Sequence, residues 1–105
     1  MINKCDVVII GAGAAGMMCA IEAGKRGRKV ILLDHAKKIG EKIRISGGGR
    51  CNFTNIYTDH KKFISSNPNF MISALKQYTH QNFIDLIQKY HISFHEKKLG
   101  QLFCD

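Results

Sequence analysis

The sequence has few of the features that mark linkers, repeats or metal-binding frameworks. It contains one proline, Pro68, and no internal repeat or low-complexity tract. None of its cysteines forms a C-x-x-C pair, the spacing that zinc sites and dithiol enzymes use. We therefore predict no metal site, and we expect reduced thiols at all four cysteines, which are Cys5, Cys19, Cys51 and Cys104.

Long hydrophobic runs are also lacking. Residues 7–21 form a charge-free stretch, but its 15 residues fall short of the ~20 that a membrane-spanning helix needs. Asp6 at its head and the glycines within it do not suit a secretory signal. The sequence therefore predicts a cytoplasmic protein without a membrane partner.

Acidic residues are scarce. Eight Asp and Glu against sixteen Lys and Arg give a net charge of +8 and a pI of about 9.5. Such a positive field attracts phosphates, nucleic acid or acidic lipid, and the motifs must decide among them. A length of 105 residues with 45% hydrophobic content is typical of one folded domain and leaves no room for a second catalytic domain.

The first third of the chain predicts a strand, a helix and a second strand. Residues 5–10 form an apolar, β-branched run that is typical of a strand buried on both faces of a parallel sheet. Residues 14–26 carry apolar side chains at helical spacing, and Gly27 follows as a C-cap. A second apolar run, residues 30–33, ends at Asp34. This order predicts a right-handed βαβ unit.

The rest of the chain predicts one long loop, two helices and a hairpin. Residues 35–55 hold several basic residues and a glycine triplet, and we expect a long functional loop there. Residues 69–78 and 79–90 show helical spacing, with Thr79 as the N-cap of the second helix. The residues on either side of a turn at 97–100 resemble a hairpin. The stripe of the second helix that we expect to pack in the core consists of Phe83, Ile84, Leu86, Ile87 and Tyr90.

A glycine motif stands at the turn from the first strand into the helix. Residues 11–16, Gly-Ala-Gly-Ala-Ala-Gly, match G-x-G-x-x-G. Its first glycine permits the tight turn, its second lets a pyrophosphate approach the backbone, and its third lets the helix pack close to the strands. The free N–H groups at the start of that helix then face the phosphates. The residues assigned to the pyrophosphate are Gly11, Gly13, Ala14, Ala15 and Gly16, and a glycine turn without a ligand is the alternative.

Asp34 extends this motif. It follows the second predicted strand, where a carboxylate accepts both hydroxyls of an adenosine ribose. Because a carboxylate repels a 2′-phosphate, the site favours FAD or NAD over NADP, although Lys37 and Lys38 nearby weaken that preference. The fold class expected is α/β: a truncated, Rossmann-like FAD- or NAD(P)-binding βαβ unit, followed by a loop, helices and a short hairpin.

A second motif is more specific. Residues 45–55, Ile-Ser-Gly-Gly-Gly-Arg-Cys-Asn-Phe-Thr-Asn, together with residues 11–34, resemble the BaiN-like (YhiN-like) bacterial flavoproteins, also known as aminoacetone oxidase family FAD-binding enzymes. The resemblance implies FAD as cofactor and a FAD-dependent oxidoreductase as the class of enzyme, in which the cofactor carries hydride or electrons. No catalytic acid, base or nucleophile can be named, and the substrate cannot be named either.

The same resemblance implies that the glycine-rich segment lines the cofactor. Three glycines let the backbone lie against a flat ring or a phosphate, Arg50 supplies a forked cation, and Asn52 supplies donors and acceptors. A surface loop without a ligand is the alternative, and for Cys51 we favour a packed, neutral thiol over a redox role. The residues added to the cofactor site are His35, Lys42, Ser46, Gly47, Gly48, Arg50 and Asn52.

The resemblance covers nearly all of this chain but only the beginning of the family, whose members are several times longer. Residues 1–105 are therefore expected to be the N-terminal portion of an incomplete FAD-binding domain, too short to be active alone, with the missing downstream part as a partner. One residue departs from the family, whose members tend to carry proline at the position of Cys104.

The residues leave three alternatives to this function. One is a non-catalytic remnant that binds adenine nucleotides weakly. Another is a small basic nucleic-acid-binding protein that uses the pairs Lys61–Lys62 and Lys97–Lys98 beside aromatic residues, but no known nucleic-acid module is visible. A zinc site at His91, His95 and Cys104 is disfavoured, because an extended segment does not aim the two histidines at one point.

Overall fold

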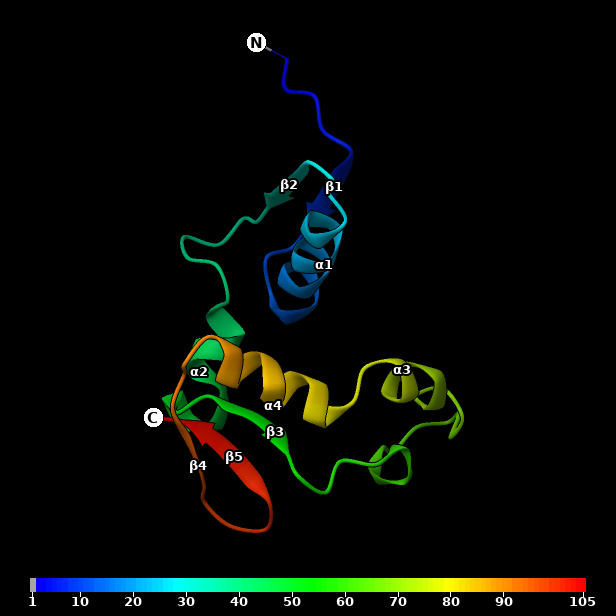
Figure 1. The fold of residues 1–105 in the computed structure, drawn as a ribbon, viewed down its shortest axis with the longest axis vertical. Coiled ribbons are helices and arrows are strands. Elements are labelled where there is room, and N and C mark those ends of the chain that lie inside the picture. Colours follow the sequence, from blue (N-terminus) through cyan, green and yellow to red (C-terminus); the bar gives the residue numbers. More distant parts are fainter. Residues whose placement is uncertain (1) are drawn as a thin grey trace. The chain divides into compact units, whose positions relative to one another are not determined.

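The computed structural model describes residues 2–105. The chain divides into two compact units, the first ending at Ile45 and the second spanning Ser46–Asp105. Each unit has its own small sheet (Figure 1). Within residues 2–105, no helix is both long and apolar enough to cross a membrane.

The first unit is a βαβ unit, as the sequence predicts. Strand β1 (Val7–Ile10) pairs in parallel with strand β2 (Val30–Leu33), and helix α1 (Ala14–Lys25) connects them. The register places Val7 opposite Val30 and Ile10 opposite Leu33. Because the strands are parallel, both carboxyl ends lie at the same edge of the sheet, where the glycine motif and Asp34 begin.

Only one face of this sheet is covered within the described residues. Along β1, Val7 and Ile9 are half-buried, whereas Val8 is 56% exposed and Ile10 is 87% exposed. Helix α1 packs on the side of Ile9, because a β-carbon at Gly16 would lie 3.4 Å from Ile9 Cγ2. The expectation that this strand is buried on both faces is therefore wrong for these residues: one helix covers one face of a two-stranded sheet.

The second unit contains a three-stranded antiparallel sheet in the order β3-β5-β4. Strands β4 (Phe94–Glu96) and β5 (Gln101–Cys104) form the predicted hairpin, and strand β3 (Asn52–Asn55) adds to the other side of β5. Leu102 and Phe103 on the central strand are 4% and 5% exposed, and they form the buried core of this unit together with Ile84.

Two α-helices separate β3 from the hairpin along the chain of the second unit. Helix α3 (Ile72–Gln77) follows the turn that holds Pro68, and helix α4 (His80–Lys89) follows at once. As predicted, Thr79 caps α4: its hydroxyl accepts from the Asn82 N–H, and the Asn82 side chain accepts from the Thr79 N–H in return.

The packed face of α4 is narrower than the predicted stripe. Ile84 is buried, and its neighbours at helical spacing are half-buried, with the Phe83 ring 5.9 Å from the Phe53 ring of β3. Tyr90, which we expected in the core, is 62% exposed because it follows the last helical residue.

The predicted loop over residues 35–55 is wrong in two places. The first is helix α2 (Glu41–Gly49), which is interrupted by non-helical backbone at Ser46, Gly47 and Gly48. Outside the expected loop, a short 3₁₀ turn lies at His60–Lys62. The last part of the expected loop is β3, whose pattern Asn-Phe-Thr-Asn carries no apolar run. Its pairing partner, β5, lies far along the sequence, so no local signal marks β3 as a strand.

Gly16 offers a test of the close contact between α1 and the strand loop. A β-carbon there would lie 1.8 Å from the Gly11 carbonyl oxygen. Because of this overpacking, Gly16→Ala is expected to lower the free energy of unfolding by about 1–3 kcal/mol. Gly24→Ala on the same helix is the control, because its β-carbon meets nothing within 4 Å. That control is expected to stabilise by about 0.5–1 kcal/mol. Urea unfolding measures both, and equal effects of the two changes would contradict the packing role.

Candidate dinucleotide-binding site

The glycine motif forms a tight turn held by backbone hydrogen bonds. Gly11 has φ = +107°, which requires glycine, and its N–H donates to the Leu33 carbonyl at 2.7 Å. Ala12 is 1% exposed, and its carbonyl accepts from the Gly40 N–H at 2.9 Å. The turn is therefore fixed both to β2 and to the segment that enters α2.

The start of α1 presents unpaired N–H groups. Gly13 is the N-cap and supplies no capping side chain, and the first turn contains no acidic residue. None of the described residues accepts a hydrogen bond from the N–H groups of Ala14, Ala15 or Gly16. A β-carbon built on Gly13 would meet nothing within 4 Å, so the space in front of these groups is open. Together with the positive end of the helix dipole, this is an anion-binding arrangement.

Asp34 holds this turn in place through its carboxylate. One oxygen accepts from the Ala12 N–H at 2.7 Å and the other accepts from the Ala36 N–H at 2.7 Å. These two bonds, with the Ala36 bond the stronger cause, lower the pKa of the Asp34 carboxyl from its ordinary value, and the side chain is only 18% exposed. Each oxygen retains a second lone pair, so the same carboxylate can also accept a ribose hydroxyl.

The other predicted residues of the first unit lie near the surface. The His35 side chain is fully exposed, with Nδ1 at 3.9 Å from an Asp34 oxygen. Lys42 is exposed in α2, two residues after Gly40, whose N–H bonds to Ala12. The structure therefore places the start of α2 beside the glycine turn, while the roles of His35 and Lys42 toward a cofactor stay predictions.

The remaining predicted residues belong to the second unit and surround a left-handed backbone run. Gly47, Gly48 and Gly49 have φ of +60°, +70° and +86°, and Cys51 has φ of +54°. A β-carbon on Gly47 would lie 2.7 Å from the Phe103 ring, so glycine is needed there for packing. By contrast, β-carbons on Gly48 and Gly49 would meet nothing within 4 Å.

Two side chains follow this glycine run. Arg50 is exposed. The Asn52 amide, oriented with its nitrogen toward two carbonyls, donates to Leu102 O at 3.1 Å and to Thr54 O at 3.2 Å. Asn52 thus fixes the start of β3 against β5, a structural role that its sequence position does not indicate. The cofactor roles assigned to Ser46, Gly47, Gly48, Arg50 and Asn52 stay predictions.

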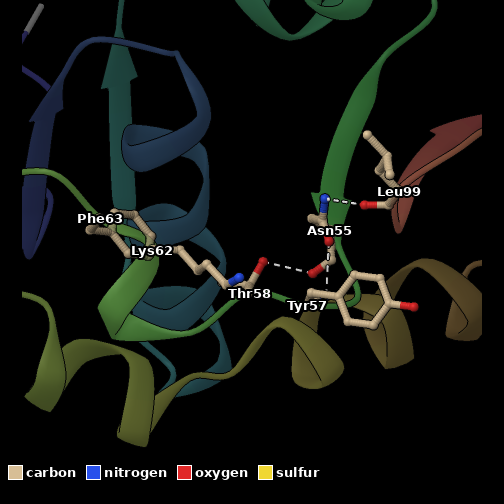
Figure 2. A pocket seen from close by; sticks show the side chains of 6 residues that line it. All are labelled: Asn55, Tyr57, Thr58, Lys62, Phe63 and Leu99. Atoms are coloured by element: carbon tan, nitrogen blue, oxygen red, sulfur yellow. Dashed lines mark hydrogen bonds between the residues drawn. The ribbon is translucent and has the colours of Figure 1, made fainter.

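A shallow pocket in the second unit was not predicted. It has a volume of about 320 Å³. Its polar groups bond mainly to one another: Asn55 Nδ2 donates to the Leu99 carbonyl at 3.0 Å, and the Thr58 hydroxyl donates to the Asn55 carbonyl at 2.6 Å (Figure 2). In the sequence, the lysine of this pocket, Lys62, stood out only as a member of the basic pair Lys61–Lys62. The residues that line the pocket are Asn55, Tyr57, Thr58, Lys62, Phe63 and Leu99.

The histidines considered for zinc do not converge. His95 Nδ1 lies 2.6 Å from an Asp105 oxygen, and the His95 ring stacks on the Phe103 ring. His91, which follows α4, has a left-handed backbone. Among residues 2–105, no three His, Cys, Asp or Glu side chains form a group able to hold a metal ion.

Sequence reasoning also missed a contact between two cysteines. Cys51 and Cys104 are 53 positions apart, yet their sulfur atoms lie 3.7 Å from each other. The pairing of β3 with β5 produces this contact. Because β3 itself was not predicted, no signal in the sequence could have joined the two residues.

A parallel βαβ unit with G-x-G-x-x-G at the start of its helix defines a Rossmann-type dinucleotide-binding unit. The family model of the HI0933-like protein Rossmann domain matches residues 5–105, so the chain belongs to this family. This confirms the resemblance to YhiN-like and BaiN-like flavoproteins, and the Rossmann-like fold class.

The chain is similar to several curated proteins along most of its length. It is 56% identical over 103 residues to the ribosomal RNA dihydrouridine synthase of Escherichia coli, and the aligned region covers 98% of this chain and 26% of that protein. It is 53% identical over 98 residues to the enzyme of the same name from Haemophilus influenzae, covering 93% of this chain and 24% of that protein. The 3-dehydro-bile acid delta(4,6)-reductase of Clostridium scindens is 39% identical over 72 residues, covering 67% of this chain and 18% of that protein. The chain thus spans about a quarter of the length of the first two relatives.

The lowered pKa of Asp34 predicts a pH-dependent contribution to stability. A carboxyl whose pKa is lower in the folded chain than its ordinary value of about 3.9 stabilises the fold fully above that value, and the contribution disappears as pH falls through the folded pKa. We therefore expect Asp34→Asn to destabilise at neutral pH, and the difference from the parent chain to shrink below about pH 4.

The measurement is the free energy of unfolding as a function of pH for both chains. Asp85→Asn is the control, because Asp85 is an exposed carboxylate on α4 whose hydrogen bond comes from Gln81 of the same helix. The control removes the same charge elsewhere. A deficit of Asp34→Asn that is the same at pH 7 and at pH 2.5 would show that the ionised carboxylate does not hold the turn.

Proposed function

We propose that this chain supplies the FAD-binding Rossmann portion of a flavin-dependent oxidoreductase. The observation that carries the proposal is the start of α1, where the N–H groups of Ala14, Ala15 and Gly16 have no acceptor among residues 2–105 and a β-carbon on Gly13 would meet nothing within 4 Å. A diphosphate bridge has the charge and the acceptor atoms that suit this arrangement. The relatives with reductase and synthase names support a redox role.

The proposed roles follow the position of each residue. The backbone of Gly11, Gly13, Ala14, Ala15 and Gly16 binds the pyrophosphate, and the free lone pairs of Asp34 accept the adenosine ribose hydroxyls. The residues proposed to contact further parts of the cofactor are His35, Lys42, Ser46, Gly47, Gly48, Arg50 and Asn52. FAD supplies the hydride or electron transfer when bound, and the protein supplies position and electrostatics.

The proposed substrate of the longer protein is a uridine in ribosomal RNA. The two relatives at 56% and 53% identity both carry the name ribosomal RNA dihydrouridine synthase. Dihydrouridine contains two more hydrogens than uridine, which is the change that a reduced flavin can deliver. The net charge of +8 also suits a polyanionic RNA.

Gly13→Asp separates cofactor binding from folding. Aspartate is a favourable N-cap near the positive end of a helix, so the substitution is expected to keep or raise the free energy of unfolding, by about 0.5–1 kcal/mol. The same carboxylate occupies the open space and repels a diphosphate. We therefore expect a loss of FAD affinity of at least tenfold, or about 1.4 kcal/mol, measured by titration of flavin fluorescence.

Gly24→Asp is the matched control, since it introduces the same charge at the other end of α1, where a β-carbon meets nothing within 4 Å. It is expected to leave FAD affinity unchanged. Equal FAD binding by the parent chain and by Gly13→Asp would overturn the pyrophosphate assignment. A chain that ignores FAD but binds RNA with steep salt dependence would favour the nucleic-acid-binding alternative.

The substrate is tested by exchange of the matching segment. Residues 1–105 replace the corresponding part of the Escherichia coli ribosomal RNA dihydrouridine synthase, and the chimera is expressed in a strain that lacks that enzyme. Mass spectrometry of ribosomal RNA is expected to show dihydrouridine restored by the chimera and absent with its Gly13→Asp version. A chimera that carries FAD yet restores no dihydrouridine would refute the substrate while leaving the cofactor assignment intact.

A further inference from the structure

The β3–β5 pairing places two thiols opposite each other in the second unit. Asn52 pairs with Phe103, and one step further along the same register the Cys104 N–H donates to the Cys51 carbonyl at 3.1 Å. The two sulfur atoms are 3.7 Å apart, and both cysteines are half-buried and free. Cys51, which directly precedes β3, and Cys104 at the end of β5 thus make the only sulfur–sulfur contact recorded within residues 2–105.

We propose that Cys51 and Cys104 form a redox-active dithiol that small-molecule disulfides oxidise to an intramolecular disulfide. Residues directly opposite in an antiparallel pair have Cα atoms about 4.5–5.5 Å apart. That range lies inside the window of about 4.4–6.8 Å that a disulfide needs. Closing the sulfur atoms from 3.7 Å to a bond therefore requires side-chain rotation rather than separation of the strands.

The exchange reaction balances with a disulfide RSSR as oxidant. Cys51 loses its proton, attacks one sulfur of RSSR and forms a mixed disulfide, while the other half leaves and takes the proton as RSH. Cys104 then loses its proton and attacks Cys51 Sγ, which forms the Cys51–Cys104 bond and releases the second RSH. The two protein thiols lose two electrons, and RSSR is reduced to two thiols.

The surroundings of Cys104 set the order of these steps. Burial, followed by the Cys51 thiol and then the nearby Asp105 charge, raises the pKa of the Cys104 thiol to about 11. Cys104 is therefore poor as the first nucleophile and suits the second, intramolecular attack.

The bond would join the glycine-rich turn to the central strand of the sheet. Cys51 ends that turn: its backbone is left-handed, and its N–H donates to the Ser46 carbonyl at 2.9 Å. Cys104 ends β5. This inference uses only contacts within the second unit and does not depend on FAD binding.

The test is oxidation of the folded chain in glutathione buffers of increasing disulfide content. Remaining thiols are then alkylated, and the products are identified by intact mass and peptide mapping. The parent chain is expected to lose the mass of two hydrogens and to yield a Cys51–Cys104 peptide. A Cys5→Ser, Cys19→Ser double variant is expected to give the same product, since neither residue takes part.

One single variant and a denatured sample complete the experiment. Cys104→Ser is expected to retain a glutathione adduct on Cys51, because no second thiol displaces it. The chain oxidised in urea is expected to give mixed pairings of all four cysteines. A stable glutathione adduct on Cys51 of the parent chain, or the same mixed pairings with and without urea, would overturn the proposal.

Discussion

The glycine turn depends on one carboxylate. Asp34 stands at the end of β2, and its two oxygens accept from Ala12 and Ala36, each at 2.7 Å. The turn would otherwise leave a buried N–H group of Ala12 without an acceptor, which is costly inside a protein. Because parallel pairing brings the carboxyl ends of β1 and β2 to one edge, this bond is short in space although it spans 22 residues.

Three glycines of the motif serve three separable purposes. Gly11 is needed because its φ is positive, and Gly16 is needed because a β-carbon there would lie 1.8 Å from a carbonyl oxygen. Neither reason applies to Gly13. Its φ of −85° suits any residue, and the space around it is open. The fold therefore requires Gly11 and Gly16, whereas Gly13 is the position at which the proposed diphosphate would approach the backbone.

The sequence predicted the first unit well because its signals are local. Apolar runs mark β1 and β2, helical spacing marks α1, and a glycine motif stands between them. The capped helix α4 and the β4–β5 hairpin were likewise predicted from neighbouring residues. The burial of β1 was misjudged, because it depends on what covers the sheet and not on the composition of the strand.

Features formed by distant residues were not predictable in this way. Strand β3 has no apolar alternation and exists because β5 offers it a partner. Three contacts depend likewise on residues far apart in the sequence. They are the hydrogen bond from the Ala12 N–H to Asp34, the bond from the Asn52 amide to the Leu102 carbonyl, and the contact between the sulfur atoms of Cys51 and Cys104. A pattern of residue types gives the kind of ligand that a segment suits, but the bonds that hold the segment must come from three-dimensional structure.

The bare start of α1 has a thermodynamic consequence. Helix α4 has a reciprocal side-chain cap, whereas the N-cap of α1 is Gly13, which has no capping side chain. A glycine N-cap is less favourable than Ser, Thr, Asn or Asp by roughly a few tenths of a kcal/mol, so α1 begins slightly below its attainable stability. In the proposed function, the diphosphate of the cofactor would accept from the N–H groups at the start of α1 and so act as its cap, and the helix would be more rigid with the cofactor bound than without it.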